Sequence, residues 1–449
     1  MMLPAAEYAR RRRQLMRQIG ERGIAILPAA PVRVRNRDAD YRYRQDSDFL
    51  YLTGFEEPEA VAVLIPGRKQ GEFILFCRER DPLQETWHGR RAGQAGAVER
   101  YGADDSFPIA DIDEILPGLL ENRDRVFYSM GRDAVFDRQL MDWVNRLRAQ
   151  VRSGRQSPHE FVSLEFLLHE MRLFKSSAEL KLMRRSAEIA IEGHRRMMAM
   201  CRPGLYEYEV EAEFIYTVRR HRADLAYQSI VGGGENGCIL HYVDNATELR
   251  DGDLLLIDAG AEYEGYASDI TRTFPVNGRF TPAQREVYEL VLEAQLAAIK
   301  KARPGNHWND PHEAALRTLT RGLVELGLLK GQPAKLMREG AYQRFYMHRT
   351  GHWLGLDVHD VGEYKIDGQW RLLEPGMTLT VEPGLYITPA RDVPKRFHNI
   401  GIRIEDDVLV TAQGCEVLTQ AMPKSPDEIE ALVGSAAEPK VPARARRRA

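Results

Sequence analysis

Two aspartates on neighbouring strand-like runs are spaced so that they would share one charge partner. Residues 253–274 read DLLLIDAGAEYEGYASDITRTF, in which two β-rich runs flank a short polar turn. Asp258 and Asp269 lie at equal distances from the midpoint of this turn, between Tyr263 and Glu264. A symmetric antiparallel register places them directly opposite each other, with Cβ atoms about 5 Å apart. Two carboxylates among Leu, Ile and Ala would repel each other, so the sequence predicts a positive partner, most simply a metal ion.

A second stretch, MHRTGHWLGLDVHDVG at residues 347–362, carries three histidines. His348, His352 and His359 fall within a dozen residues and are interleaved with glycines, which let the backbone approach closely. A single histidine is more often a hydrogen-bonded core residue than a ligand. The group therefore indicates a site more strongly than any one of its members.

Two further strand-like runs carry carboxylates. In GMTLTVEPGLYI, Glu382 ends an apolar strand immediately before a Pro-Gly turn, and in IGIRIEDDVLVT the alternation places Arg403 and Glu405 on one face. Each has an ordinary interpretation, because a strand-end glutamate is usually part of a turn and Arg403 with Glu405 could be a simple ion pair. Their occurrence with the aspartates and histidines in one half of the chain favours a shared site.

Five of these residues have the chemistry of metal ligands: Asp258, Asp269, His352, Glu382 and Glu405. Four carboxylates and one imidazole form an oxygen-dominated set whose charge balances two divalent cations. This composition suits two Mn²⁺ or Co²⁺ ions better than a thiolate or multi-histidine zinc site. Two carboxylates would bridge the ions, and a water or hydroxide between them would be the nucleophile.

The elements that must position these residues fall into two parts. An amphipathic helix at 7–22, a buried strand at 23–29 and further alternating strands and helices predict a mixed α/β domain. The segment RSGRQSPHE at 152–160 is the most linker-like one. We predict an N-terminal domain at 1–155, a linker and joining helix at 156–175, a catalytic domain at 176–435 and a disordered basic tail at 436–449.

The second half of the chain contains a faint internal repeat. CRPGLYEYEVEAEF at 201–214 and ARPGNHWNDPHEAA at 302–315 each follow a long helical pattern, and each is followed by a helix and by strands with acidic residues. Ser176 and Ser177 are placed as caps of the first long helix. A duplicated αβ unit would place two similar hairpins around one cavity.

Composition excludes several classes of protein. The 449 residues have a formal net charge of −3, which gives no field that favours nucleic acid. The four cysteines are far apart, without a CxxC pair, which excludes a zinc-finger framework, implies no disulfide scaffold and fits a reducing compartment. Charged residues interrupt every candidate signal peptide or membrane span. The sequence therefore predicts a cytoplasmic protein without a membrane or nucleic-acid partner.

The motifs IDAGAEYEGYASDITRTF, HRTGHWLGLDVHD, TVEPGLY and GIRIEDD resemble those of the creatinase-like, or pita-bread, metallopeptidases. YRYRQDSDFLYLTGF at 41–55 and ENGCILHY at 235–242 are similar to the bacterial aminopeptidase P branch of that family. The resemblance extends from about residue 5 to about residue 430. It implies an N-terminal mixed α/β domain followed by a pita-bread catalytic domain with a pseudo-two-fold αβ duplication. It also implies an Xaa-Pro aminopeptidase, which removes the first residue of peptides with proline at the second position.

The resemblance also implies roles for the ligands. Asp258 would chelate one metal, Asp269 and Glu405 would bridge, and His352 and Glu382 would complete the second site. Glu382 would be the general base that takes a proton from the bridging hydroxide. The ions would be Mn²⁺, with Co²⁺ or Zn²⁺ as alternatives.

Three groups of residues match the family's substrate contacts. The resemblance implies that His241, His348 and His359 hold the substrate and stabilise the tetrahedral intermediate, and that Arg403 and Tyr386, with His348, form the pocket that receives proline. It implies that Asp38 and Trp87 of the N-terminal domain approach the site, with Asp38 near the free amino group of the substrate. A free amine needs an acidic partner, and the X-Pro nitrogen carries no hydrogen, so the proline slot needs no N–H acceptor. The resemblance further implies a homodimer or homotetramer in which a neighbour's N-terminal domain, through Trp87, narrows the cleft.

Four alternatives remain at this point. A prolidase, which cleaves only X-Pro dipeptides, would use the same metals and fold. A methionine aminopeptidase needs no N-terminal domain of this kind, and creatinase itself lacks the metal. A catalytically inactive pita-bread binding module would have lost ligands, whereas all five are present in this sequence.

Overall fold

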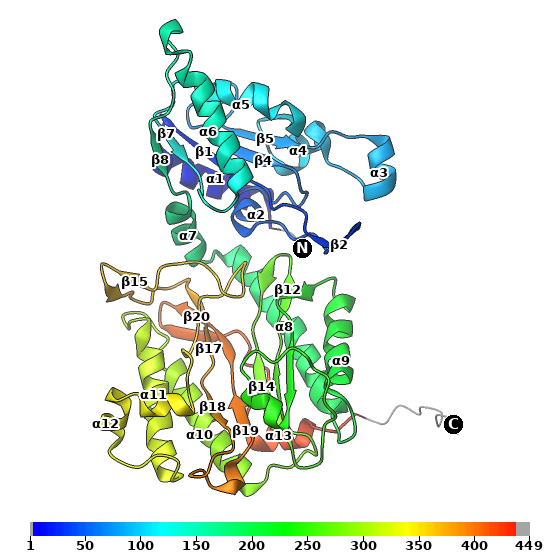
Figure 1. Ribbon diagram of the computed structural model, residues 1–449, viewed down its shortest axis with the longest axis vertical. Helices are drawn as coiled ribbons and strands as arrows, with labels where there is room; N and C mark the ends of the chain where they lie inside the picture. The colour runs from blue at the N-terminus through cyan, green and yellow to red at the C-terminus, as the bar shows by residue number, and fades with distance from the viewer. Residues whose placement is uncertain (1–2, 437–449) are drawn as a thin grey trace. The chain divides into compact units, whose positions relative to one another are not determined.

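The computed structural model describes residues 3–436, which fold into two compact units (Figure 1). The first unit ends at Arg172 and the second begins at Leu173. The segment 156–175, expected to join the domains, contains a strand, β8 (Glu160–Val162), and a helix, α7 (Glu165–Leu173). The expected basic tail lies, from residue 437 onward, outside the described residues. The domain limits drawn from the sequence stay predictions.

A six-stranded mixed sheet forms the centre of the first unit, in the order β6-β5-β4-β1-β7-β8. Its other strands are β1 (Gly23–Pro28), β4 (Val61–Leu64), β5 (Phe73–Cys77), β6 (Asp105–Pro108) and β7 (Arg125–Phe127). β1 runs antiparallel to β4 and parallel to β7. The central strands are unbroken apolar runs whose side chains, such as Ile24 and Val63, share a buried core with Leu116 and Trp143 of the helices.

The helices of this unit are α1 (Ala5–Ile19), α2 (Ser47–Thr53), α3 (Pro82–His88), α4 (Gly93–Tyr101), α5 (Ile112–Leu120) and α6 (Ala134–Arg148). The predicted helix at 7–22 is therefore displaced toward the N-terminus. It ends at Ile19 because Gly20, with φ +74°, takes a backbone conformation that closes the helix. A short exposed hairpin of β2 (Val34–Asn36) and β3 (Ala39–Asp40) precedes α2.

Two pairs of long helices form the frame of the second unit. Its helices are α8 (Ser177–Met200), α9 (Glu207–Arg220), α10 (Pro282–Ile299), α11 (Asn309–Glu325), α12 (Pro333–Arg338) and α13 (Pro426–Leu432). α8 packs on α9 and α10 packs on α11, and α9 and α11 lie on opposite sides of the strands (Figure 1). α8 and α10 begin with the same capping box, formed by Ser176 with Glu179 and by Thr281 with Gln284. The predicted duplicated fold class is confirmed.

The strands of this unit form small sheets between the helices. One sheet consists of β10 (Ile230–Gly233), β11 (Leu254–Asp258) and β14 (Thr271–Pro275), and a second consists of β9 (Asp224–Leu225), β12 (Ala261–Tyr263) and β13 (Tyr266–Ala267). A third sheet consists of β17 (Thr378–Val381), β20 (Asp406–Thr411) and β21 (Gly414–Val417). Two strand pairs complete the unit: β18 (Gly384–Ile387) with β19 (Ile400–Arg403), and β15 (Lys365–Ile366) with β16 (Gln369–Trp370). Among residues 3–436, no helix is both long and apolar enough to cross a membrane.

The register of the 253–274 hairpin differs from the prediction. Asp258 pairs with Thr271, and not with Asp269. The two turn positions are Glu264 and Gly265, with φ +52° and +82°, so the hairpin is centred one residue later than expected. Asp269 therefore lies diagonally from Asp258 and on the same face, because the alternation of side chains is kept. The predicted shared face is right, and the predicted direct pairing is wrong.

Candidate metal centre

One cavity of about 500 Å³ in the second unit gathers most of the predicted site residues. Its walls include His241, Asp258, Asp269, His348, His352, His359, Glu382, Arg403 and Glu405. Tyr386 is buried beside it and contacts two of these residues. Asp38 and Trp87 belong to the first unit, where Asp38 is exposed between β2 and β3 and Trp87 is exposed on α3.

Three possible ligands meet at the centre of the cavity. One donor atom from each of Asp269, His352 and Glu405 lies within 4.8 Å of the other two. His352 Nε2 is 3.3 Å from Asp269 Oδ2 and 3.8 Å from Glu382 Oε1. The cluster therefore combines oxygen and imidazole donors at distances that one small cation would close.

The tautomer of His352 is set by its own backbone surroundings. Its Nδ1–H donates to the carbonyl of Trp353 at 2.9 Å, so Nε2 is the nitrogen directed at the carboxylates. Metal-binding histidines commonly have this arrangement, in which one nitrogen is held and the other coordinates. Burial by itself would lower the pKa of His352, but the carboxylates of Asp269 and Glu382 favour the protonated ring and raise the pKa to about 9.

Asp258 differs from the other carboxylates because it has a fixed cationic partner. Arg403 Nη2 donates to Asp258 Oδ2 at 2.6 Å. Burial would raise the pKa of Asp258, but Arg403, together with the hydrogen bond from the Tyr227 hydroxyl, holds it below its usual value. Asp258 is therefore a carboxylate that stays ionised.

In contrast to Asp258, the carboxyl groups of Asp269, Glu382 and Glu405 have pKa values above their usual ones. Burial is the largest cause in each case, and the neighbouring carboxylates add to it, so the pKa of Asp269 is raised, that of Glu405 is raised well above its usual value and that of Glu382 rises to about 7. The like-charge repulsion inferred from the sequence is thus present in the folded chain.

Tyr227 is a residue of this site that the sequence did not indicate. Its hydroxyl contacts both aspartates and lies 2.6 Å from Asp258 Oδ1, with Asp269 Oδ1 on its other side. Tyr227 follows β9, some thirty residues before Asp258, and no spacing relates it to the hairpin. Only the tertiary structure brings it between the two carboxylates.

Thr271 was likewise not singled out, although it stands in the hairpin. Its hydroxyl donates to Glu405 Oε2 at 2.6 Å and accepts from Arg403 Nε at 3.2 Å. Thr271 can contact both residues because its strand, β14, packs against β19, the strand that ends at Arg403. The predicted common face of Arg403 and Glu405 is consistent with this shared partner.

A chain of hydrogen bonds joins Arg403 to His348. Arg403 Nη1 donates to the hydroxyl oxygen of Tyr386 at 2.8 Å, and the Tyr386 hydroxyl lies 2.9 Å from His348 Nε2. His348 Nδ1–H donates to the carbonyl of Arg349, so Nε2 is the acceptor for Tyr386. Burial, with the nearby Arg403, lowers the pKa of His348 to about 4 and keeps the ring neutral. Predicted proline-pocket residues are therefore joined in one network.

Glu382 occupies a crossing between two sheets. It follows β17, which pairs with β20, and precedes β18, which pairs with β19. The predicted Pro-Gly turn is therefore wrong, since the chain continues forward into a strand of another sheet. A Cβ on Gly384 would lie 2.8 Å from the carbonyl oxygen of Ile402, so this crossing requires glycine.

The donor set fits a pair of divalent cations. Asp269, His352 and Glu405 meet directly, Asp258 stands beside Asp269 through Tyr227, and Glu382 stands beside His352. Carboxylate oxygens together with an imidazole are ligands that divalent metal ions accept.

The fold and this cavity together define a metallopeptidase. Residues 181–412 match the family model Metallopeptidase family M24, and residues 8–128 match Aminopeptidase P, N-terminal domain. The chain belongs to Metallopeptidase family M24.

Relatives match along nearly the whole chain. The Xaa-Pro aminopeptidase of Escherichia coli K12 is 48% identical over 432 residues, which are 96% of this chain and 98% of the relative. A solved structure of Pseudomonas aeruginosa aminopeptidase PepP is 60% identical with a TM-score of 0.95 and covers 96% of this chain and 98% of that one. Zinc-substituted E. coli aminopeptidase P in complex with product is 47% identical, with a TM-score of 0.95, and covers 98% of this chain and 100% of that one.

Proposed function

We propose that this chain is a metal-dependent Xaa-Pro aminopeptidase, which hydrolyses the bond between the first residue of a peptide and a proline at the second position. The observation that carries this is the meeting of Asp269, His352 and Glu405 within 4.8 Å in a cavity that Asp258 and Glu382 also line. Family membership and full-length relatives with this activity support the substrate class.

The five ligands would hold two divalent ions, for which we propose Mn²⁺. Asp258 would bind one ion, Asp269 and Glu405 would bridge, and His352 and Glu382 would bind the other. Such ions act as Lewis acids toward the peptide carbonyl and make water acidic enough to attack at neutral pH.

The protein's own groups would then move the proton. Glu382 would take the proton from the attacking water and deliver it to the proline nitrogen, which has no hydrogen of its own and must gain one to leave as an amine. His241, His348 and His359 would hold the substrate and stabilise the developing oxyanion. Glu382 and these histidines line the same cavity, which supports this division of roles.

Specificity for proline would come from the network of His348, Tyr386 and Arg403. The polar atoms of these three side chains hydrogen-bond to one another. They therefore need no hydrogen-bond partner from the substrate, and a proline ring offers none. Asp38 would bind the free amino group, and Trp87 would narrow the cleft of a neighbouring subunit in a homodimer or homotetramer. The four cysteines are free thiols, which supports a cytoplasmic location.

The test compares an X-Pro-Y tripeptide with an X-Pro dipeptide. Chelator-treated protein is assayed with and without Mn²⁺, Co²⁺ or Zn²⁺, and products are identified by mass spectrometry. Metal-dependent release of the first residue from the tripeptide, with little attack on the dipeptide, is expected. Cleavage of the dipeptide alone would instead identify a prolidase, and no cleavage by protein that binds metal would identify a binding module.

Variants locate the activity in the cavity. Glu382→Gln is expected to lower kcat by about 10²–10⁴-fold, because it removes the proton acceptor. Glu313→Gln, on the exposed side of α11, is the matched control and should keep the parental rate. Equal rates for the two variants would contradict the role of Glu382.

A further inference from the structure

Arg272 is a completely buried cation immediately behind the candidate metal centre. It stands on β14, one residue after Thr271, and its side chain has no exposed surface. It does not line the cavity, so it is neither a ligand nor a substrate contact. A guanidinium in such a place is costly unless all its donors are satisfied.

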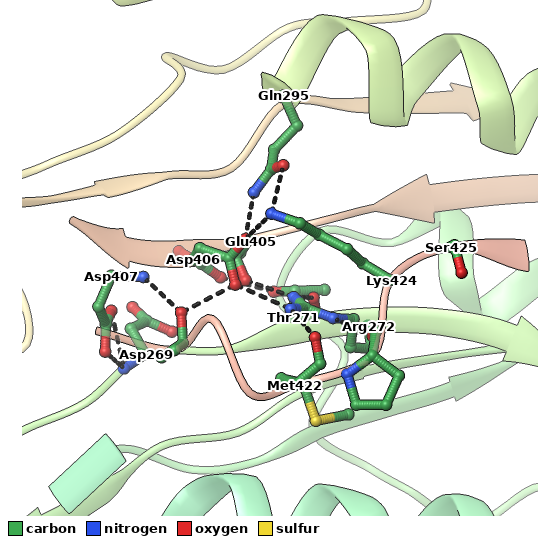
Figure 2. A network of polar contacts seen from close by, with 12 residues as sticks. Asp269, Thr271, Arg272, Gln295, Glu405, Asp406, Asp407, Met422, Lys424 and Ser425 are labelled. Atoms are coloured by element: carbon green, nitrogen blue, oxygen red, sulfur yellow. Dashed lines mark hydrogen bonds and ion pairs between the residues drawn. The ribbon is translucent and has the colours of Figure 1, made fainter. Parts of the chain in front are cut away.

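The Arg272 guanidinium donates to five oxygen atoms (Figure 2). Nη1 donates to the main-chain oxygens of Thr271 at 2.9 Å and Glu405 at 2.5 Å. Nη2 donates to Asp406 Oδ1 at 2.8 Å and to the Met422 carbonyl at 3.3 Å. Nε donates to the Pro423 carbonyl at 2.8 Å. One side chain therefore holds β14, the start of β20 and the 422–423 segment together.

Asp406, the anionic partner of Arg272, is itself fully saturated. Its Oδ2 accepts from Lys424 Nζ and Gln295 Nε2, each at 2.6 Å, and its Oδ1 also accepts from the Thr419 hydroxyl at 2.8 Å. The Asp406 side chain has no exposed surface. The ion pair is thus fixed from α10 and from the segment beyond β21 as well as from β14.

This arrangement matters because the two proposed bridging ligands stand at the ends of strands in different sheets. Asp269 precedes β14, which pairs with β11, and Glu405 precedes β20, which pairs with β17 and β21. Within the described residues, no strand ladder joins β14 to β20. Their relative position depends on single contacts, including Glu405 N–H to the Thr271 carbonyl at 3.1 Å and the Arg272 bonds.

A second crossing contact reinforces the first. The Asp269 N–H lies 3.1 and 3.2 Å from the two carboxylate oxygens of Asp407, on β20 (Figure 2). Arg272 thus holds the main chain of Glu405 from the β14 side, and Asp407 holds the main chain of Asp269 from the β20 side. The two carboxylates are kept close although they repel each other.

We propose that Arg272 is a positioning residue for the metal centre, which fixes the spacing of Asp269 and Glu405 so that both can reach the same ion. This inference rests on the proposed metal-dependent function. Arginine is required because its planar fork of donors spans five acceptors, whereas a lysine ammonium offers three donors from one point.

The test measures metal binding directly. Mn²⁺ is titrated calorimetrically into chelator-treated parent, Arg272→Lys and Arg272→Met, and the EPR spectrum of the loaded proteins reports the coupling between two bridged ions. Arg272→Met is expected to bind Mn²⁺ about 10–100-fold more weakly and to lose the coupled spectrum. Arg272→Lys, which keeps the charge, should lose affinity to a smaller degree and show an altered spectrum.

A double variant separates positioning from stability. Arg272→Met leaves Asp406 with Lys424 as its cationic partner, whereas Arg272→Met with Asp406→Asn removes the buried carboxylate charge but keeps an acceptor for Lys424 Nζ, and should recover part of the lost thermal stability. It should still bind Mn²⁺ weakly, because the link to Glu405 is absent. Arg172→Met, which breaks the buried pair with Asp48 in the first unit, is the matched control for loss of a buried arginine and should keep parental Mn²⁺ affinity.

The outcomes distinguish this inference from the function on which it rests. If the parent binds no Mn²⁺, Co²⁺ or Zn²⁺, the metal centre itself is wrong. If the parent binds metal and the folded Arg272→Lys or double variant has parental affinity and an unchanged spectrum, the positioning role is overturned and the proposed function stands.

Discussion

At the scale of single residues, the carboxylates of the cavity differ in what surrounds them. Glu405 accepts from the Thr271 hydroxyl, and burial together with the neighbouring carboxylates raises its pKa well above the usual value. Asp258 is paired with Arg403 at 2.6 Å. Removing a negative charge therefore has opposite consequences at the two positions.

We predict that Glu405→Gln makes the chelator-treated protein more stable above pH 5. The pKa of Glu405 is higher in the folded protein than in the unfolded chain. Ionisation of Glu405 therefore lowers the stability of the fold once the pH rises above the unfolded-state pKa, and glutamine avoids this loss because it does not ionise. The gain should be on the order of 1 kcal/mol, or a few degrees in Tm, and should shrink toward pH 4. Differential scanning calorimetry at several pH values measures it.

Asp258→Asn is the matched comparison and should lower the Tm at neutral pH. It leaves the buried Arg403 without its anionic partner, and breaking one side of a buried pair is strongly destabilising. Both variants should lose activity. Glu405→Gln with a lower apo Tm than the parent, at neutral pH, would mean that Glu405 has a structural role beyond its hydrogen bond from Thr271.

Tyr227→Phe should weaken metal binding without loss of the fold. The hydroxyl donates within the aspartate pair, and losing such a contact to a ligand is expected to reduce metal affinity by about tenfold. Isothermal titration with Mn²⁺ tests this, and Tyr263→Phe, in the β12 strand, is the control tyrosine. Parental affinity in Tyr227→Phe would show that the contact does not orient the ligands.

At the scale of elements, the buried glutamate at the start of α9 organises the loop that carries His241. Glu207 Oε1 accepts from Gly233 N–H at 2.7 Å and Asn236 Nδ2 at 3.0 Å, and Oε2 accepts from the Tyr242 hydroxyl and Thr247 N–H, each at 2.8 Å. One carboxylate thus closes both ends of the 233–247 segment onto the helix.

Glu207→Ala should destabilise the protein by roughly 2–4 kcal/mol, because several buried donors lose their acceptor. It should also lower kcat/KM, since the loop with His241 loses its anchor. Glu207→Gln, which keeps one carbonyl acceptor, should fall between parent and alanine variant. Glu211→Ala on the same helix is the control, and equal unfolding midpoints for Glu207→Ala and Glu211→Ala would rule out the anchoring role.

At the scale of the whole molecule, the two units have separate cores and separate buried ion pairs. In the first unit Asp48 contacts Arg172 at 2.8 Å and His169 at 3.3 Å. Burial would raise the pKa of Asp48, but His169 and Arg172 hold it well below its usual value. Such a group stabilises the fold above the unfolded pKa near 4, and this contribution disappears as the pH falls through the folded pKa.

Asp48→Asn should therefore lower stability by roughly 3 kcal/mol at pH 7, and the difference from the parent should diminish below about pH 4. Thermal unfolding of both proteins between pH 7 and pH 3 measures this. A difference that stays constant over the whole range would show that Asp48 acts through packing or neutral hydrogen bonds and not through its charge.

Assembly is the other property of the whole molecule that can be tested. Trp87 is 76% exposed on α3, a helix with no buried residues. If it contacts a neighbouring subunit, Trp87→Ala should weaken self-association by at least about tenfold and raise KM for longer peptides. Light scattering on dilution measures the first effect, with Val135→Ala, also exposed at 78%, as control. Unchanged association and KM would contradict this contact.

The sequence by itself determined which residues could bind metal and which broad fold would hold them. Strand alternation, the capping serine at Ser176 and the repeated helix starts are local features, so the chemistry of each segment could be read without its neighbours. This is why Asp258, Asp269, His352, Glu382 and Glu405 could all be selected, and the structure gathers them in one cavity.

Only the tertiary structure decided how those residues meet. The register of the 253–274 hairpin depended on whether Gly265 follows the turn or is one of its two central residues. The path of the chain at Glu382 depended on which sheets the strands before and after it join. Tyr227, Thr271 and Arg272 come close to the ligands through packing between separate sheets, which leaves no periodic pattern in the chain. Ligand identity is therefore a local property of the sequence, whereas ligand spacing arises from contacts between segments far apart in it.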